Sequence, residues 1–145
     1  MITMPPHITT WIEPRHEAVL ITTRRDGSPQ SCNVVYAMRD GVARVSVTAD
    51  RAKTRNLRRS PRGVLHVLGD SFWQYAAFSV DAALSPVTTT TTAGDLTGLE
   101  LLEVYEAITG APHPDPSEFF AAMIQEQRLV LHLSPVSAVG MGVDG

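Results

Sequence analysis

The chain has 145 residues, of which 43% are hydrophobic, 19% are charged and 6% are aromatic, and its formal net charge is -3 at pH 7. This length suits one compact domain spanning residues 1–145 and is too short for two domains of ordinary size. The single cysteine, Cys32, excludes an internal disulfide, and the lack of a basic leader and of roughly 20 consecutive apolar residues predicts a soluble, cytoplasmic protein with no membrane partner.

The first predicted elements form a β-meander between residues 17 and 49. The runs 17–25, 28–39 and 42–49 are rich in β-branched residues, and the pairs Asp26-Gly27 and Asp40-Gly41 separate them. Asp-Gly is typical of a tight hairpin turn because both turn positions tolerate positive φ. In the middle run, bulky residues alternate with small or polar ones, as in a strand with one face on a core. We therefore expect three antiparallel strands joined by two hairpins.

A short helix and more strands follow this meander. Residues 51–60 are compatible with a helix that Asp50 caps and that Pro61 ends, and the runs 63–69 and 72–85 predict two further strands. The threonine-rich stretch 86–95 has no packing periodicity and predicts a loop. Helical spacing favours a helix over 96–109, a second helix begins at Pro116, and the β-branched run 128–142 predicts a closing strand. The fold class is therefore mainly β, a six-stranded antiparallel barrel with flanking helices.

Charge along the chain is strongly localised. Residues 51–62 contain 6 of the 12 basic residues and no acidic residue, which leaves 6 basic against 15 acidic residues elsewhere. The segment includes Lys53, the only lysine. A helix start offers unpaired amides and a partial positive charge, so cationic side chains around it favour a phosphate or carboxylate ligand. A solvated helix face is the alternative interpretation of such a charge run.

These segments together resemble a known family. The run RAKTRNLRR (51–59), the hairpin DGSPQSCNVVYAMRDG (26–41) and the strand FWQYAAFSVDAAL (72–84) are similar to the pyridoxamine 5′-phosphate oxidase-like split-barrel superfamily. Within it, the likeness is greatest to the small deazaflavin (coenzyme F420)-dependent proteins of the actinobacterial branch, and it covers roughly residues 15–135. The resemblance implies the FMN-binding split β-barrel fold and a homodimer with its cofactor site at the subunit interface.

The resemblance also implies residue roles. Arg51, Lys53 and Asn56 would hold the phosphate or acidic tail of the cofactor, with help from the Thr54 hydroxyl. The tricyclic ring would lie against the second and third strands, and two aromatic residues from the partner subunit would close the pocket. The residues for these two tasks are Gln30, Asn33, Val34, Val35, Ser46 and Val47 for the ring, and Trp73 and Tyr75 for the closure.

The function implied is an F420-dependent oxidoreductase. Such an enzyme transfers a hydride between the deazaflavin and a small organic acceptor, which the sequence does not identify. The proton could come from solvent or from a tyrosine such as Tyr36, and no residue is assigned as the catalytic acid. Two alternatives remain open: an FMN-dependent oxidase or reductase of the same fold, and a non-catalytic cofactor carrier or sensor.

Other classes of function receive little support from the sequence. His66 and His132 lie in apolar strands without a partner at metal-ligand spacing, so each is interpreted as a structural histidine and no metal is expected. Nucleic-acid binding would depend on the arginine-rich segment alone, and the acidic remainder argues against it. Hydrolase and dinucleotide-binding motifs do not occur.

Overall fold

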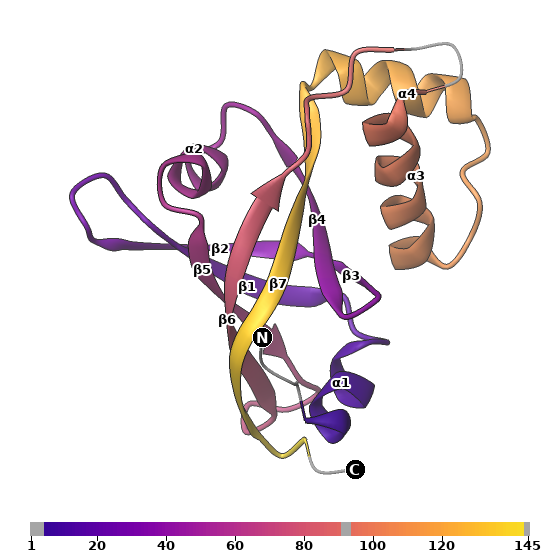
Figure 1. The fold of residues 1–145 in the computed structure, drawn as a ribbon. Coiled ribbons are helices and arrows are strands. Elements are labelled where there is room, and N and C mark those ends of the chain that lie inside the picture. Colours follow the sequence, from indigo (N-terminus) through magenta and orange to yellow (C-terminus); the bar gives the residue numbers. More distant parts are fainter. Residues whose placement is uncertain (1–4, 91–93, 144–145) are drawn as a thin grey trace.

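The computed structural model describes residues 5–90 and 94–143. Described elements comprise four helices and seven strands (Figure 1). The helices are α1 (Pro6–Ile12), α2 (Ala52–Arg59), α3 (Leu96–Thr109) and α4 (Pro116–Gln125). The strands are β1 (Glu17–Thr23), β2 (Pro29–Val35), β3 (Ala37–Arg39), β4 (Val42–Thr48), β5 (Arg62–Leu68), β6 (Tyr75–Leu84) and β7 (Arg128–Met141).

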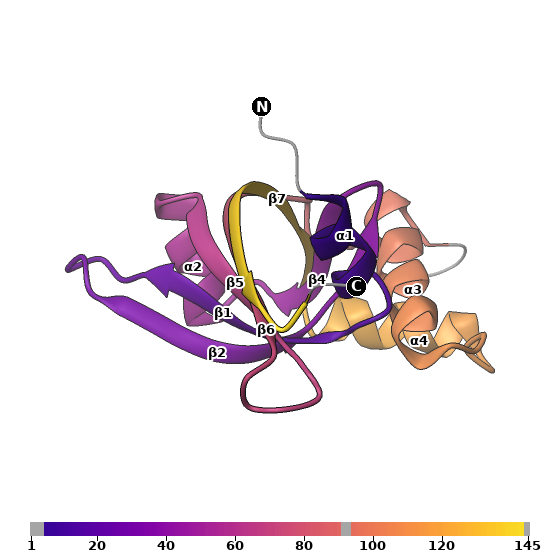
Figure 2. The same ribbon diagram turned by 90° about the horizontal axis from the view of Figure 1, so that it is seen from below.

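All seven strands belong to one antiparallel sheet with the order β2-β1-β5-β6-β7-β4-β3. Strands β2 and β3 lie at opposite ends of this order, yet only Tyr36 separates them in the chain. The sheet must therefore curl until its two edges approach each other, and Figure 2 shows this curl. A curled sheet whose edges meet without full pairing is a split barrel, which confirms the predicted fold class.

The strand count differs from the predicted six because the expected second strand divides at Tyr36. Tyr36 and Ala37 are both buried, which breaks the period of two in the middle of the run. The Tyr36 amide donates to the His16 carbonyl over 2.8 Å, so the chain leaves the β1 edge at this residue. Both Asp-Gly hairpins are confirmed, but β2 pairs with β1 and β3 pairs with β4, so the three strands do not form a simple meander.

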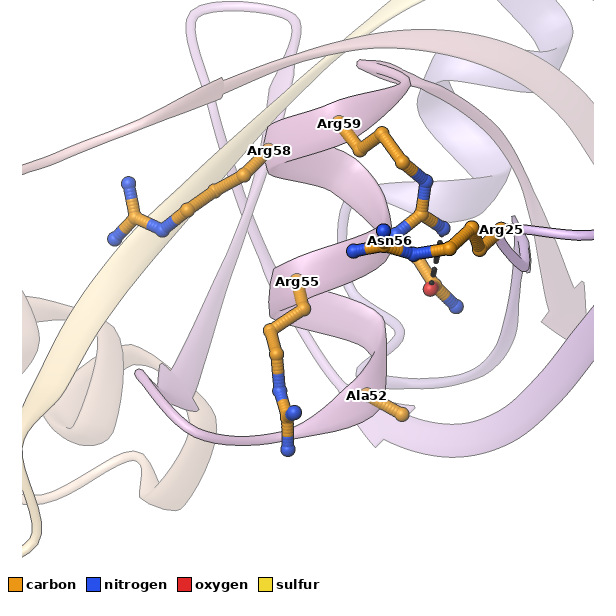
Figure 3. A pocket seen from close by; sticks show the side chains of 6 residues that line it. All are labelled: Arg25, Ala52, Arg55, Asn56, Arg58 and Arg59. Carbon is orange, nitrogen blue, oxygen red and sulfur yellow. Dashed lines mark hydrogen bonds between the residues drawn. The ribbon is translucent and has the colours of Figure 1, made fainter.

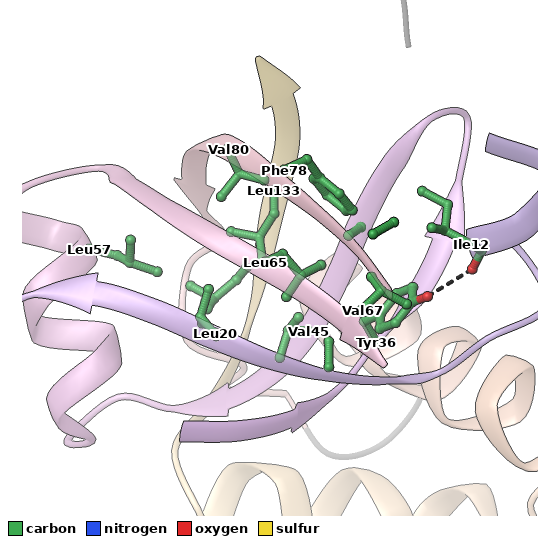
Figure 4. Close-up of a cluster of buried hydrophobic side chains, with 14 of the residues drawn as sticks. Ile12, Leu20, Tyr36, Val45, Leu57, Leu65, Val67, Phe78, Val80 and Leu133 are labelled. Atoms are coloured by element: carbon green, nitrogen blue, oxygen red, sulfur yellow. Dashed lines mark hydrogen bonds between the residues drawn. The ribbon is translucent and has the colours of Figure 1, made fainter. Parts of the chain in front are cut away.

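The barrel interior is filled by one cluster of apolar side chains from all around the sheet (Figure 4). Leu20, Val45, Leu65 and Leu133 are at most 1% exposed. Helix α1, which was not predicted, covers one end of this core with Ile8 and Ile12, spaced four residues apart. The Tyr36 hydroxyl donates to the Ile12 carbonyl over 2.8 Å and fixes the helix there.

Helices α3 and α4 pack outside the barrel beside β4 and β7, and α2 lies at the end away from α1 (Figures 1 and 2). Phe119, Phe120 and Leu101 form a second apolar cluster with Val130 of β7. Within the described ranges, no helix is long and apolar enough to cross a bilayer.

Polar contacts also fasten α3 to the sheet. Glu100 accepts from His132 Nε2 over 2.9 Å, and Glu103 Oε1 lies 3.1 Å from the guanidinium of Arg44, which is only 4% exposed. The interpretation of His132 as a structural histidine agrees with this contact, because its ring joins β7 to the helix.

Candidate functional site

Helix α2 is fixed to the barrel by its buried side. The Thr54 hydroxyl donates to the Thr48 carbonyl over 2.8 Å, and Leu57 is fully buried. Asn56, only 6% exposed, donates to Thr22 Oγ1 over 3.1 Å and to Gln30 Oε1 over 2.9 Å. The predicted helix is confirmed, but its N-cap is Arg51 and no side chain caps it, so the predicted Asp50 cap is wrong.

The exposed side of α2 borders a surface cavity of about 590 Å³ that is lined by arginines (Figure 3). Arg55, Arg58 and Arg59 come from α2, and Arg25 comes from the β1–β2 hairpin. Asn56 and Ala52 complete the lining, and no carboxylate belongs to it. We call this cavity the arginine cleft.

Two of the four arginines are positioned by hydrogen bonds. Arg59 donates to the Asn56 side-chain oxygen and to the Thr23 carbonyl, each over 2.9 Å. Arg55 donates to the Asp50 carbonyl over 2.8 Å. The side chains of Arg25 and Arg58 make no hydrogen bond or ion pair with any other residue in the described ranges. Guanidinium groups without carboxylate partners repel one another, and a phosphate or carboxylate ligand would relieve that repulsion.

The residues predicted to bind the phosphate are only partly brought together. Asn56 lines the arginine cleft. Thr54, in contrast, is fully buried, and its hydroxyl donates to the Thr48 carbonyl. Arg51 is exposed at the N-cap, one helical turn before Arg55. Lys53 is half-buried and, at about 100° per residue, lies on nearly the opposite side of α2 from Arg55.

The predicted ring-lining residues of β2 are divided between two faces. Gln30 and Val34 point to the inner side of the sheet, where Gln30 bonds Asn56 and Val34 packs on the core. Asn33 and Val35 are exposed on the outer side and border a cavity of about 300 Å³ together with Leu68. A ring bound on this outer face would contact the side chains of Asn33 and Val35. It would reach only the backbone of Gln30 and Val34.

The two predicted residues of β4 also point to opposite faces. Val47 is 1% exposed and belongs to the barrel core. The Ser46 hydroxyl accepts from Arg128 NH1 over 3.2 Å. Both side chains therefore have partners within the chain.

Trp73 and Tyr75 occupy different local structures. Trp73 lies in the β5–β6 connection, is 69% exposed and packs edge-on against Phe72. Tyr75 begins β6 and stacks on His66, with the ring centroids 4.8 Å apart. The register places Tyr75 between Leu68 and Met141, which are both exposed.

Tyr36 is a poor candidate for a proton donor. Its ring is fully buried, its hydroxyl is bonded to Ile12, and burial raises the pKa of that hydroxyl well above the ordinary value for tyrosine. A donor must reach the reacting atom, and Tyr36 is enclosed in the core.

Arg55 belongs to the basic helix start that the sequence predicts to favour an anion, whereas Arg25, Arg58 and Arg59 of the cleft were missed at the sequence level. Arg58 and Arg59 lie in the same basic segment, and their i+3 and i+4 spacing from Arg55 places all three on one face of α2. Nothing in the sequence around Arg25 indicates an anion site, because Arg25 reaches the cleft only when the β1–β2 hairpin folds beside α2.

Several proteins of known structure are similar to this chain. No protein-family model matches the chain. An F420 reductase matches with a TM-score of 0.71 and 22% identity, covering 94% of this chain and 98% of that one. A pyridoxamine 5′-phosphate oxidase-related, FMN-binding protein from Nostoc punctiforme matches with a TM-score of 0.63 and 15% identity, covering 94% and 84%. The heme storage protein HutZ from Vibrio cholerae matches with a TM-score of 0.67 and 15% identity, covering 97% and 96%.

These matches confirm the predicted resemblance at the level of the fold. The chain has the split-barrel fold of the pyridoxamine 5′-phosphate oxidase-like, FMN-binding proteins. An F420 reductase, an FMN-binding protein and a heme storage protein are all among the matches, so the fold alone does not select a cofactor. Within the described residues, no group of three or more His, Cys, Asp or Glu side chains is placed to hold a metal ion.

Proposed function

We propose that the chain is an F420-dependent oxidoreductase that binds the acidic tail of its cofactor in the arginine cleft. The observation that carries this proposal is a cavity lined by four arginines, from two separate segments, and by no carboxylate. The donor set fits a ligand with several negative charges, because arginine binds phosphate and carboxylate through paired N–H groups.

The outer face of the sheet supplies the surface for the cofactor ring in this proposal. Asn33 and Val35 border a mostly apolar cavity on that face, and Leu68 forms its other wall. An apolar slot suits a flat ring, and the arginines of the cleft suit an anionic tail, so the cofactor would extend along β2 from Asn33 toward Gln30, which contacts α2. When bound, reduced deazaflavin supplies a hydride; the chain supplies orientation and anion binding.

The proposal includes a homodimer of a single-domain, cytoplasmic subunit. Leu68, Val139 and Met141 are 43%, 65% and 48% exposed, and the register places Leu68, Tyr75 and Met141 in one row across β5, β6 and β7. A contiguous apolar surface of this kind favours burial against a second copy. The partner would then cover the ring-binding face, with Trp73 and Tyr75 at the boundary.

Titration of the purified protein with F420, FMN and hemin tests the proposal. We expect F420 to bind, followed by its fluorescence, and we expect Arg55→Ala with Arg58→Ala to weaken that binding by about 100-fold, the factor for two lost charge-assisted contacts. The matched control is Arg62→Ala, from the same basic segment, because Arg62 pairs with Asp81 and does not line the cleft.

The outcomes separate the cofactor alternatives. If the protein binds FMN and not F420, the proposed cofactor becomes a flavin, while the proposed role of the arginine cleft in anion binding is retained. Binding of hemin alone, or equal F420 affinity in the double variant and the Arg62→Ala control, would overturn the proposed function. Tight F420 binding without reduction of any acceptor would favour a carrier over an enzyme.

A further inference from the structure

A second site lies on the outer face of the sheet, where His66 and Tyr75 stack. Their ring planes differ by only 13°, and their centroids are 4.8 Å apart. His66 points outward because it alternates with the buried residues Leu65 and Val67. Since His66 pairs with Ala77 in the register, Tyr75 is its diagonal neighbour on β6, at the spacing where long side chains meet.

The stacked pair borders a cavity of about 350 Å³. Leu68 and Phe72 add apolar walls, and small or polar residues of the β5–β6 connection complete it. Neither the His66 imidazole nor the Tyr75 hydroxyl has a hydrogen-bond partner among residues 5–90 and 94–143. Two groups that can donate protons therefore face one cavity with their polar atoms unused.

The connection that forms one wall of this cavity is fastened at three points. Arg15 NH1 donates to Asp70 over 2.9 Å, the Gln74 side chain accepts from the Asp70 amide over 2.9 Å, and it donates to the Gly142 carbonyl over 3.0 Å. Gly69 is required where the ends of the turn meet, because an added Cβ would lie 2.3 Å from the Gln74 carbonyl oxygen. These contacts hold the cavity in a defined shape.

The cavity adjoins the surface assigned to the cofactor ring. Asn33, Val19 and His66 lie in one row across β2, β1 and β5. Two strand spacings separate Asn33 from His66, roughly 10 Å. Leu68 lines both cavities, so a compound beside His66 would lie next to a ring bound at Asn33.

We propose that the His66–Tyr75 pair binds the hydride acceptor, a flat conjugated carbonyl compound, and that His66 donates its proton. This inference rests on the proposed function. Stacked rings and apolar walls suit a planar compound, and the unused donors suit a carbonyl oxygen. A hydride supplied by the reduced cofactor would form a C–H bond at the electron-poor carbon; the C=C electron pair would then form a new double bond to the carbonyl carbon, and the C=O π pair would move onto the oxygen.

The proton step then completes the reduction. The imidazolium of His66 gives its N–H proton to that oxygen and becomes neutral, and solvent restores the proton. The acceptor has gained one hydride and one proton, and the cofactor has lost two electrons. Histidine is the side chain most often used for such a transfer near neutral pH.

The first test measures binding without cofactor. Duroquinone serves as the probe because its ring carbons are fully substituted, which prevents addition of the Cys32 thiol. We expect it to quench the fluorescence of Trp73, which packs on Phe72 at the cavity. His66→Ala should weaken duroquinone binding about tenfold, the factor for one lost hydrogen bond. The control is His132→Ala, since His132 bonds Glu100 on another part of the barrel.

The second test measures turnover with F420 and duroquinone. His66→Ala should lower kcat by about 100-fold or more, the range for loss of a general acid, while F420 affinity stays unchanged. Free imidazole in the buffer should restore part of the rate, because it can enter the space left by the ring. Tyr36→Phe should leave kcat unchanged, since that hydroxyl is buried.

Each outcome decides a separate claim. Equal duroquinone affinity in His66→Ala and His132→Ala would overturn the binding site. Unchanged kcat, or a loss that imidazole does not restore, would overturn the proton-donor role. If the protein binds neither F420 nor FMN, the proposed function fails and the proton-donor role fails with it, whereas the duroquinone titration still decides the binding site.

Discussion

Asn56 of α2 donates a hydrogen bond of 2.9 Å to the side-chain oxygen of Gln30 in β2. The same amide group donates to Thr22 of β1, and its oxygen accepts from Arg59. One buried side chain thus links the helix to two strands and also orients an arginine of the cleft. The stability of the barrel edge and the geometry of the anion site are therefore coupled through Asn56.

We predict that Asn56→Ala destabilises the protein and weakens anion binding together. Loss of the buried amide leaves Thr22 and Gln30 without this partner, so the free energy of unfolding should fall by about 1–3 kcal/mol. Urea unfolding followed by circular dichroism measures this change. Arg55→Ala is the control, because an exposed substitution should change stability by less than about 0.5 kcal/mol. Equal stability of the two variants would contradict the linking role of Asn56.

The local signals in the sequence predicted the hairpins and most helices correctly. Gly27 and Gly41 adopt φ angles of 88° and 77°, the conformation for which Asp-Gly was interpreted as a turn. Gly110 ends α3 in the left-handed conformation, as its position after the helical run predicts. Each of these features depends on a few neighbouring residues, which the sequence displays directly.

Long-range pairing could not be predicted in the same way. The division of the second strand at Tyr36 follows from the placement of β2 and β3 at opposite edges of the sheet. Likewise, Arg25 enters the arginine cleft only because the β1–β2 hairpin folds beside α2. The spacing of Ile8 and Ile12 was a usable signal for α1, since four residues place both side chains on one helix face.

A second prediction tests the residues assigned by the family resemblance. We expect Arg51→Ala with Lys53→Ala to weaken cofactor binding, because both cations lie in the first turn of α2 or at its cap. Folding should change little, since Arg51 is exposed and Lys53 is half-buried. Fluorescence titration with F420 beside urea unfolding separates the two effects. Unchanged cofactor affinity would contradict the phosphate-binding role of Arg51 and Lys53 and would leave the arginine cleft as the only proposed anion site.

A third prediction concerns the homodimer. Val139 is 65% exposed on the outer face of β7, so Val139→Glu should leave the fold intact while placing a charge in the proposed interface. Sedimentation velocity should show a dimer for the parent protein and a monomer for the variant, with weaker F420 binding. Leu96→Glu is the matched control, because Leu96 is 86% exposed on α3, outside that face. A parent protein that sediments as a monomer would remove the dimer from the proposal.

Asp95 provides a pH-dependent contact at the start of α3. Burial raises the pKa of its carboxyl, but hydrogen bonds from the Thr89 and Gly98 amides, the Thr88 hydroxyl and the Thr90 amide outweigh this effect and hold the pKa at about 2, below the ordinary 3.8. The donor–acceptor distances to the Gly98 and Thr89 amides are both 2.7 Å. The ionised carboxylate therefore caps α3 and also binds Thr88, Thr89 and Thr90.

The fourth prediction follows from the direction of this shift. Because the pKa of Asp95 is lower in the folded protein than in the unfolded chain, its stabilising contribution is complete above about pH 4 and is lost as the pH falls toward about 2. In Asp95→Asn the amide oxygen still caps the helix but does not titrate, so the variant should be less stable than the parent by about 1 kcal/mol at neutral pH. Urea midpoints of both proteins measured between about pH 2 and pH 5 should converge as the pH falls, since every other carboxyl group is common to the two proteins. A stability difference that stays constant over this range would show that the Asp95 carboxylate does not carry the contact.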